Sequence, residues 1–306
     1  MAKSKLHQLL KEQVQLSNGV LVIDQSAVRS YTKKIHEAIP KRIINKYAKS
    51  IKESGDYSSG IAPTHWYHIF TCLDQLRKLQ GNEVNDIYTR KIALALQDTQ
   101  LQDAFSEIFV ATLYGLKFPI VPDVLTAVVG KSGKQKDADL LVNSDFFVEV
   151  KNYSITKTRD YKLLEWAQEN LFETNAQNMN SGSFELIKQR GSSVYVKKFD
   201  NPNIKSIGMA NYNQLEGSRL IGLLKNAENK FRKNDRAVVV ITNVINTQDA
   251  GNAIDNYLKN KRKEEYPIKS IVITTPISPQ GKFDSTIYKV TDDQAIDAAL
   301  KDVYNL

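Results

Sequence analysis

The sequence has very little cysteine: Cys72 is the only one among 306 residues. One thiol cannot form a disulfide within the chain or supply a cysteine-based zinc site. The sequence also has no apolar run near the roughly 18 residues that a membrane-spanning helix needs. Its amino-terminal segment combines charges with no long apolar stretch, unlike a secretory signal. We therefore expect a cytoplasmic protein with no membrane partner.

Positive charge is in excess. The formal net charge is +8, and hydrophobic and charged residues make up 42% and 25% of the chain, as in globular proteins. Residues 186–236 hold eleven Lys or Arg against four acidic residues. A concentrated positive field attracts a polyanion, most commonly nucleic acid. Charge alone favours a nucleic-acid partner and a solvated basic surface about equally.

The apolar pattern divides the chain into two parts. Residues 1–100 repeat apolar side chains at helical spacing, which predicts a mainly helical amino-terminal region. Residues 101–306 alternate helical patterns with short β-branched runs, which predicts an α/β domain with a mixed sheet flanked by helices. Within it, residues 153–210 have the character of an insertion. The predicted helices lie around residues 6–14, 40–51, 64–79, 83–96, 103–114, 163–172, 215–233 and 249–263. The predicted strands lie around residues 118–124, 140–142, 146–150, 194–199, 237–241 and 270–274.

Residues 136–154, KDADLLVNSDFFVEVKNYS, predict a β-hairpin. A turn of three residues, 143–145, would place Asp139 opposite Glu149. Side chains alternate along a strand, so Lys151 would share the face of Glu149, and the other face would be apolar. A turn of two residues would shift the register by one and separate the two carboxylates.

Two carboxylates held side by side repel each other unless a cation lies between them. A hard divalent ion such as Mg²⁺ prefers oxygen ligands and can polarise a phosphate. A neighbouring lysine can orient a water molecule and offset negative charge that develops on the phosphate. The predicted hairpin therefore carries the minimum set of groups for cutting a phosphodiester bond.

Asp139, separated by nine residues from Glu149-Val150-Lys151, resembles the motif of the PD-(D/E)XK, or restriction-endonuclease-like, nuclease superfamily. The resemblance implies that Asp139 and Glu149 bind Mg²⁺ or Mn²⁺, that the Val150 carbonyl adds a ligand, and that Lys151 positions the attacking water. The family often has a further Glu on the helix before the sheet, and Glu107 occupies that place. These residues are the candidate catalytic and metal-binding set.

The resemblance extends from about residue 100 to about residue 276, because a helical pattern over 215–233 leads into the run AVVVIT. It implies an endonuclease that hydrolyses phosphodiester bonds, most commonly in DNA, in restriction, phage defence, repair or a mobile element. Many family members dimerise to cut both strands, so a homodimer is a further expectation at the family level.

The sequence departs from the family pattern in places. The literal Pro122-Asp123 pair lies too far upstream to serve as the motif aspartate, and Asp137 has the same strand parity as Asp139 and competes with it. Asp139 is preferred because it directly precedes the apolar residues of its strand. A second triplet of the same type, residues 228–230, falls in a predicted helix with no supporting context.

Basic residues near the motif are candidates for nucleic-acid binding. They lie in a Gly/Ser-containing loop, 130–136, and towards the end of the predicted helix 215–233. They are Lys131, Lys134, Lys136, Lys225, Lys230, Arg232 and Lys233. The rival interpretation is a non-catalytic nucleic-acid-binding or assembly protein that retains the nuclease fold. Simple binding would not require the carboxylate pair with its lysine.

Overall fold

The computed structural model describes residues 25–38, 41–42, 45, 63–98, 101–153, 183–189, 192–198, 212–244, 247–259, 266–276 and 282–304. The helices predicted at 6–14 and 163–172, and most of the one predicted at 40–51, lie outside these residues. The chain forms two compact units, which are residues 1–152, 226–245 and 262–306, and residues 153–225 and 246–261. Among the described helices, none has both the length and the apolar character that a bilayer crossing requires.

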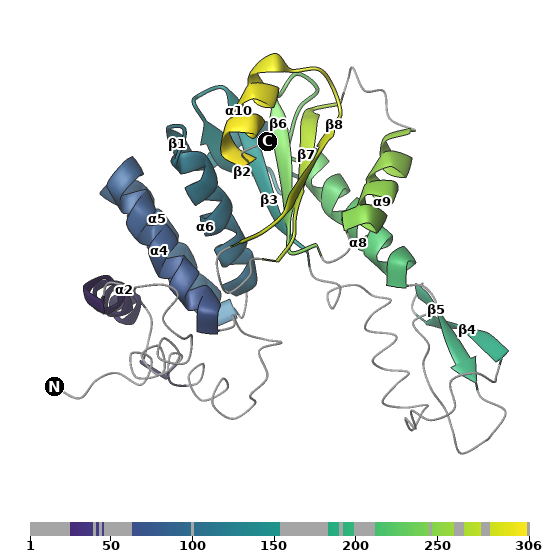
Figure 1. Cartoon of the computed structure of the whole chain (residues 1–306), viewed down its shortest axis with the longest axis horizontal. Coiled ribbons are helices and arrows are strands. Elements are labelled where there is room, and N and C mark those ends of the chain that lie inside the picture. The colour runs from purple at the N-terminus through teal and green to yellow at the C-terminus, as the bar shows by residue number, and fades with distance from the viewer. Residues whose placement is uncertain are drawn as a thin grey trace. The chain divides into compact units, whose positions relative to one another are not determined.

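The first unit is an α/β structure (Figure 1). Its helices are α2 (Gln25–Ala38), α4 (Pro63–Gln80), α5 (Asn82–Asp98), α6 (Leu101–Gly115) and α10 (Gln294–Tyr304). Its strands are β1 (Ile120–Val129), β2 (Gln135–Val142), β3 (Phe146–Asn152), β6 (Ala237–Thr242), β7 (Ile268–Thr274) and β8 (Ser285–Lys289). The predicted class, an α/β chain with a mixed sheet flanked by helices and preceded by helices, is confirmed at this level.

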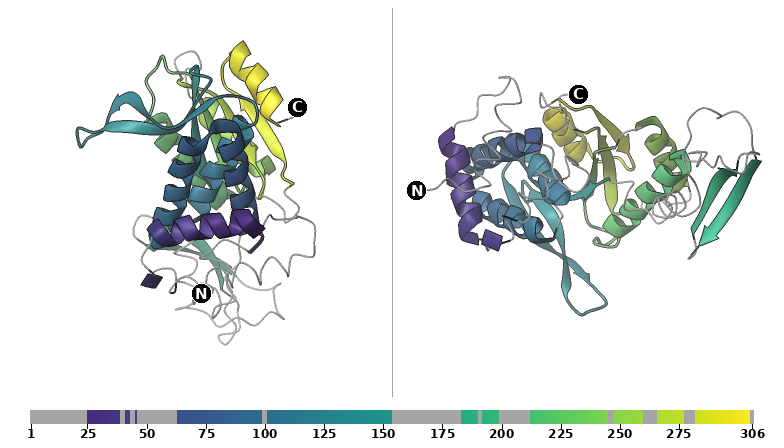
Figure 2. Two further views of the ribbon diagram at one scale, coloured as in Figure 1. Left: turned by 90° about the vertical axis from the view of Figure 1, so that its left-hand side faces the viewer. Right: turned by 90° about the horizontal axis from the view of Figure 1, so that it is seen from below.

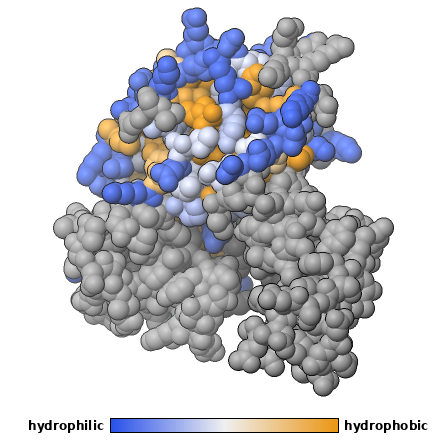
Figure 3. Space-filling view, turned by 45° about the vertical axis from the view of Figure 1, so that its right-hand side comes forward, coloured by the Kyte–Doolittle hydropathy of each residue, from blue (hydrophilic) through white to orange (hydrophobic). Residues whose placement is uncertain are grey.

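The six-stranded sheet has the order β1-β2-β3-β6-β7-β8. The pairs β3–β6 and β6–β7 are parallel, whereas the pairs β1–β2, β2–β3 and β7–β8 are antiparallel. All six residues of β6 are buried, which explains its continuous β-branched sequence AVVVIT, because a central parallel strand is covered on both faces. On the surface seen in Figure 3, the described residues are mainly hydrophilic around small apolar areas.

The second unit contains a separate two-stranded sheet. Its elements are β4 (Ser183–Gln189), β5 (Ser192–Lys198), most of α8 (Tyr212–Glu228), and α9 (Thr247–Lys259). The strand predicted at 194–199 corresponds to β5. The helix predicted at 215–233 ends earlier than expected, at Glu228, because the following residues form a turn in which the Lys230 amide donates to the Ala227 carbonyl at 2.9 Å.

Helix α6 is the centre of the core of the first unit. Its sequence LQDAFSEIFVATLYG is apolar on most sides, and eleven of its fifteen residues are buried. It packs with α4, α5 and α10 against one face of the sheet, and Tyr114 meets Phe146 of β3 edge to face at 6.3 Å between ring centroids. This packing fixes the position of α6 relative to β3, the strand that carries the candidate motif.

The helical layer is tied together by a buried amide. Asn85 of α5 is fully buried and donates to the Leu73 carbonyl of α4 at 2.7 Å and to the Tyr31 hydroxyl of α2 at 3.2 Å. Figure 2 shows α2 running across the neighbouring helices, and one amide therefore joins three helices.

Replacing this amide should loosen the layer. Asn85→Ala removes a fully buried side chain and both of its hydrogen bonds between helices, so we expect the free energy of unfolding to fall by about 2–3 kcal/mol. Urea denaturation measures the change, with the exposed Glu83→Gln of the same helix as the control. Equal midpoints for Asn85→Ala and the parent would show that the three-helix junction contributes nothing to stability.

Candidate functional site

The β2–β3 hairpin has the predicted register. Asn143 and Ser144 both have positive φ, 51° and 55°, and the Asp145 amide donates to the Val142 carbonyl at 2.9 Å. This is the geometry of a type I′ turn, which matches the twist of a hairpin. Asp145 then adds the third turn residue, so that Val142 pairs with Phe146. Asn143 suits its position, since asparagine tolerates the left-handed region better than most residues.

Extending that register places Asp139 opposite Glu149. The last paired residues are Leu140 and Val148, one step closer to the turn. At the next step the Asp139 carboxylate accepts a hydrogen bond from the Val150 amide, with 2.6 Å between Oδ2 and N. The side chain of Asp139 therefore lies between the two strands, directly beside the motif Glu149-Val150-Lys151. Asp137, the competing aspartate, is exposed and pairs with Leu125 of β1 instead.

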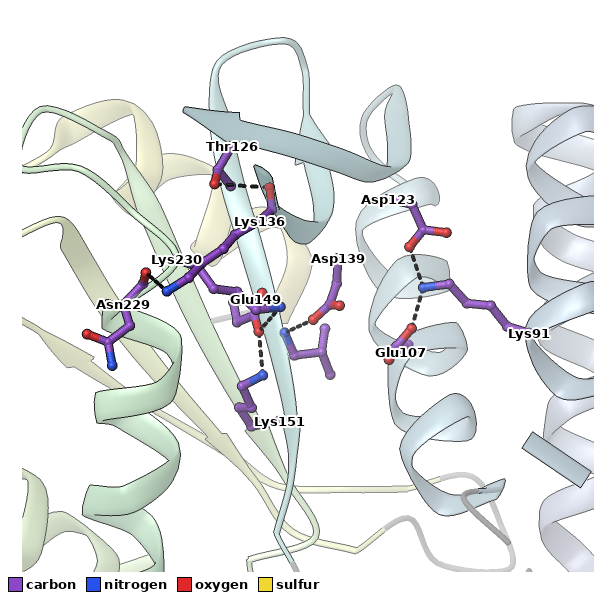
Figure 4. A network of polar contacts seen from close by, with 11 residues as sticks. Lys91, Glu107, Asp123, Thr126, Lys136, Asp139, Glu149, Lys151, Asn229 and Lys230 are labelled. Atoms are coloured by element: carbon purple, nitrogen blue, oxygen red, sulfur yellow. Dashed lines mark hydrogen bonds and ion pairs between the residues drawn. The ribbon is translucent and has the colours of Figure 1, made fainter. Parts of the chain in front are cut away.

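Glu149 is the most buried acidic group of this region, with 0% of its side chain exposed. Its Oε1 atom contacts two ammonium groups, those of Lys151 and Lys230, the latter at 2.7 Å (Figure 4). Its Oε2 atom is buried without a hydrogen-bond partner. Burial raises the pKa of Glu149 and the charge of Asp139 raises it further, while the two lysines act in the opposite direction.

Glu107 approaches the same region from α6. Polar contacts fix the start of this helix at the ends of β3 and β6: Asn152 donates to Asp103 at 2.8 Å, and Thr242 donates to Ser106 at 2.7 Å. In Figure 4, Asp139 lies between Glu149 and Glu107. Burial, followed by the charge of Asp139, raises the pKa of Glu107 to about 7.

Lys91 of α5 holds Glu107 and a further carboxylate, that of Asp123. Its ammonium lies 2.5 Å from Glu107 Oε2 and 2.6 Å from Asp123 Oδ1. Burial opposes the charge of Lys91, but the nearby carboxylates outweigh it and raise the pKa of this amine. Glu107, Asp123 and Glu149 surround Asp139, and these four carboxylates are called the acidic cluster. The helical layer contributes a cation, Lys91, to this cluster.

Asp123 was predicted to lie too far upstream to belong to the site. In the β1–β2 ladder Pro122 pairs with Leu140 and Val124 with Ala138, so Asp123 stands across from Asp139. Its φ of 55° lies in the left-handed region, although β1 continues on both sides of it. Asp123 lies far from the motif in the sequence, so the proximity of Asp123 to Asp139 was not predicted. The Pro122-Asp123 dipeptide was the only sequence feature that pointed to it.

The basic residues predicted to bind nucleic acid lie in different places. Lys131 and Lys134 are exposed at the tip of the β1–β2 hairpin, which projects from the sheet in both views of Figure 2. Lys136 lies in β2 and not in the loop as predicted, because β2 begins at Gln135, and its ammonium donates to the Asn229 carbonyl at 2.5 Å. The ammonium of Lys230 forms an ion pair with Glu149.

The remaining basic candidates are exposed. Arg232 and Lys233 follow α8 in the first unit, and the Arg232 guanidinium donates to the Ala127 carbonyl of β1. Lys225 is on α8 within the second unit. The candidates are thus divided among the hairpin tip, the turn beside Glu149 and α8.

The donor atoms of the cluster suit a hard divalent cation. Among the residues that the structure describes, no three His, Cys, Asp or Glu side chains are gathered closely enough to hold a metal ion. The donors beside Asp139 are nevertheless all oxygens, and the unpartnered Glu149 Oε2 is a buried acceptor of the type that Mg²⁺ or Mn²⁺ requires. Asp139 and Glu149 therefore fit such an ion in chemistry.

No protein family, no curated protein and no solved structure matches this chain. What the site can do therefore follows from its own residues and their geometry.

Proposed function

We propose that this protein is a divalent-metal-dependent nuclease that hydrolyses phosphodiester bonds, with DNA as its substrate. One observation carries the proposal: the fully buried Glu149 keeps one oxygen without a partner, beside Asp139 and two lysines. A buried acceptor with no donor costs free energy, and a bound ion is one of the reasons why proteins retain such an atom. A divalent cation would give the Oε2 atom of Glu149 the partner that it lacks.

The proposed relationship to the PD-(D/E)XK superfamily has two supports. The hairpin register brings Asp139 and Glu149-Val150-Lys151 together, as that motif needs. The mixed sheet flanked by helices, with Glu107 on the helix that precedes β1, agrees with a restriction-endonuclease-like fold. We therefore assign that fold as part of the same proposal.

In the proposed mechanism, Asp139 and Glu149 would hold Mg²⁺ or Mn²⁺ together with the Val150 carbonyl. Glu107, now paired with Lys91, would have to move closer to add a further ligand. Such an ion, when bound, lowers the pKa of a water molecule and polarises the phosphate. Lys151 projects on the same side of β3 as Glu149, and its ammonium orients the attacking water and offsets charge on the phosphate. The burial of Glu149 keeps this region dry, which strengthens each electrostatic interaction.

Nucleic acid is the polyanion that fits the charge of the chain. The net charge is +8, and the exposed Lys131 and Lys134 stand at the tip of a hairpin whose base carries Asp123 and Asp139. Lysines that contact backbone phosphates place a duplex without reading its sequence. The hairpin would then guide the phosphate backbone towards the acidic cluster.

A second candidate function is nucleic-acid binding without catalysis. The ion pairs of Glu149 with Lys151 and Lys230, and of Glu107 with Lys91, favour it, because they neutralise the carboxylates within the protein. In that case the acidic cluster would be structural.

A cleavage assay separates the two functions. Purified protein is incubated with supercoiled plasmid, linear duplex and single-stranded DNA in Mg²⁺, Mn²⁺ or EDTA, beside Lys151→Ala. Cutting that needs metal and that Lys151→Ala reduces by at least about a hundredfold establishes the nuclease. Salt-sensitive binding that is equal for both proteins, without cutting of any of these DNA substrates, would overturn the proposed DNA nuclease in favour of the binding protein.

A further inference from the structure

The turn that follows α8 is held in place on both sides of Lys230. Phe231 is buried, and its ring lies 5.8 Å from that of Phe147 on β3, centroid to centroid. On the other side, the Asn229 carbonyl accepts from the Lys136 ammonium of β2 at 2.5 Å. A side chain whose backbone is fixed by two strands of the sheet has a defined position before any ligand arrives.

The next residues of the turn are fixed as well. The Arg232 amide donates to Asp235 Oδ2 at 2.7 Å, and its guanidinium donates to the Ala127 carbonyl. The turn therefore contacts β1, β2 and β3, the three strands that carry Asp123, Asp139 and Glu149. No such support is needed for a solvated lysine at the end of a helix.

Lys230 brings a second ammonium to a carboxylate that already has one. Its Nζ atom lies 2.7 Å from Glu149 Oε1, the atom that Lys151 also contacts. One ammonium is enough to neutralise one carboxylate. With 22% of its side chain exposed, Lys230 remains open to a ligand.

We propose that Lys230 is a substrate-binding residue of this site. Its ammonium holds a phosphate oxygen of the nucleic acid, while Lys151 orients the attacking water. The assignment rests on the proposed function for its substrate. Around Glu149, two carboxylates face two ammonium groups. A divalent ion shared by Asp139 and Glu149 would neutralise the two carboxylates and leave the two positive charges of the lysines unbalanced. A phosphodiester and an attacking hydroxide, with one negative charge each, would balance them.

The matched comparison uses Lys230→Gln, Lys230→Arg and Lys301→Gln, the last on the exposed face of α10. Binding of a short DNA duplex is measured over a range of salt concentrations in Ca²⁺. Steady-state cleavage in Mg²⁺ gives KM and kcat, and calorimetry gives the Mn²⁺ affinity of the protein alone.

Loss of one phosphate contact has a specific signature. For Lys230→Gln we expect duplex binding and kcat/KM to fall roughly ten- to a hundredfold, and the salt slope of log K to become shallower by about one. Lys230→Arg should keep activity within a few-fold, because a guanidinium also binds phosphate. Lys301→Gln should match the parent. The Mn²⁺ affinity of Lys230→Gln should be unchanged or higher, since a competitor for Glu149 is gone.

Other outcomes overturn the assignment. An unchanged salt slope for Lys230→Gln shows that Lys230 does not contact phosphate, even if activity falls. A weaker Mn²⁺ affinity with a lowered Tm and no rescue by Lys230→Arg assigns Lys230 a purely structural role. If the parent cuts nothing, the nuclease proposal fails by itself. In that case, the salt dependence of duplex binding still decides whether Lys230 binds nucleic-acid phosphate.

Discussion

Glu149→Gln is expected to abolish metal-dependent cleavage, with a loss of roughly a thousandfold or more in kcat. The substitution keeps the size of the side chain but removes the negative charge that would attract the cation. Metal-ion catalysis contributes several kcal/mol of charge stabilisation to a phosphoryl transfer, and about 4 kcal/mol corresponds to roughly a thousandfold in rate. The effect should be the largest of any single substitution at the site, because Glu149 is the carboxylate with the unpartnered oxygen.

Two measurements check that the loss comes from the metal site. Calorimetric titration with Mn²⁺ should show weaker binding to Glu149→Gln than to the parent. The matched control is Glu83→Gln, the same chemical change on the exposed start of α5, which should keep parental cleavage and Mn²⁺ binding. If Glu149→Gln stays folded and cuts DNA at the parental rate, Glu149 has no part in the reaction.

A second large effect is expected in the pH dependence of stability, through Glu107. Its pKa rises from 4.5 to about 7 in the folded protein, because of burial first and the charge of Asp139 second. Between these values the folded chain keeps a proton that the unfolded chain has released. Raising the pH through this window therefore lowers the free energy of unfolding, by about 3 kcal/mol for the metal-free protein. Below pH 4.5 and above pH 7 this contribution is constant.

Urea denaturation in EDTA at pH 5 and pH 8 measures this change. Glu107→Gln cannot titrate, so it should lose less stability than the parent as the pH rises. The Glu83→Gln protein should follow the parent across the same interval. Parallel curves for Glu107→Gln and the parent would show that Glu107 is already ionised at pH 5, held by Lys91.

The placement of Lys91 gives the helical amino-terminal region a connection to the acidic cluster. A lysine on α5 bridges Glu107 and Asp123, while Asn85 of the same helix joins α5 to α2 and α4. The helical layer is therefore part of the environment of the candidate site. Composition and periodicity predicted the helices but suggested no such contact.

The hairpin itself was determined by local sequence. Alternation of apolar and polar residues along 140–150 predicted the hairpin and, for a turn of three residues, the register of Asp139 against Glu149. The structure has that turn, with Asn143 and Ser144 at positive φ and Val142 paired with Phe146. Strand periodicity and turn chemistry act over a few residues, so they can be followed along the chain. The helices α4, α5 and α6 were predictable for the same reason, through their 3.6-residue period.

Only the tertiary structure decided which charges meet at the site. Lys91 reaches Glu107 across 16 residues, Lys151 and Lys230 converge on one oxygen of Glu149, and Asp123 stands across from Asp139. The triplet at 228–230 looked like part of a helix without context, yet α8 ends at Glu228 and a turn carries Lys230 to the sheet. Such contacts depend on how distant strands and helices pack, and no local period of the sequence encodes them. The sequence thus determined the motif and the hairpin that carries it, while the folded structure determined the turn length and the cations that surround the motif.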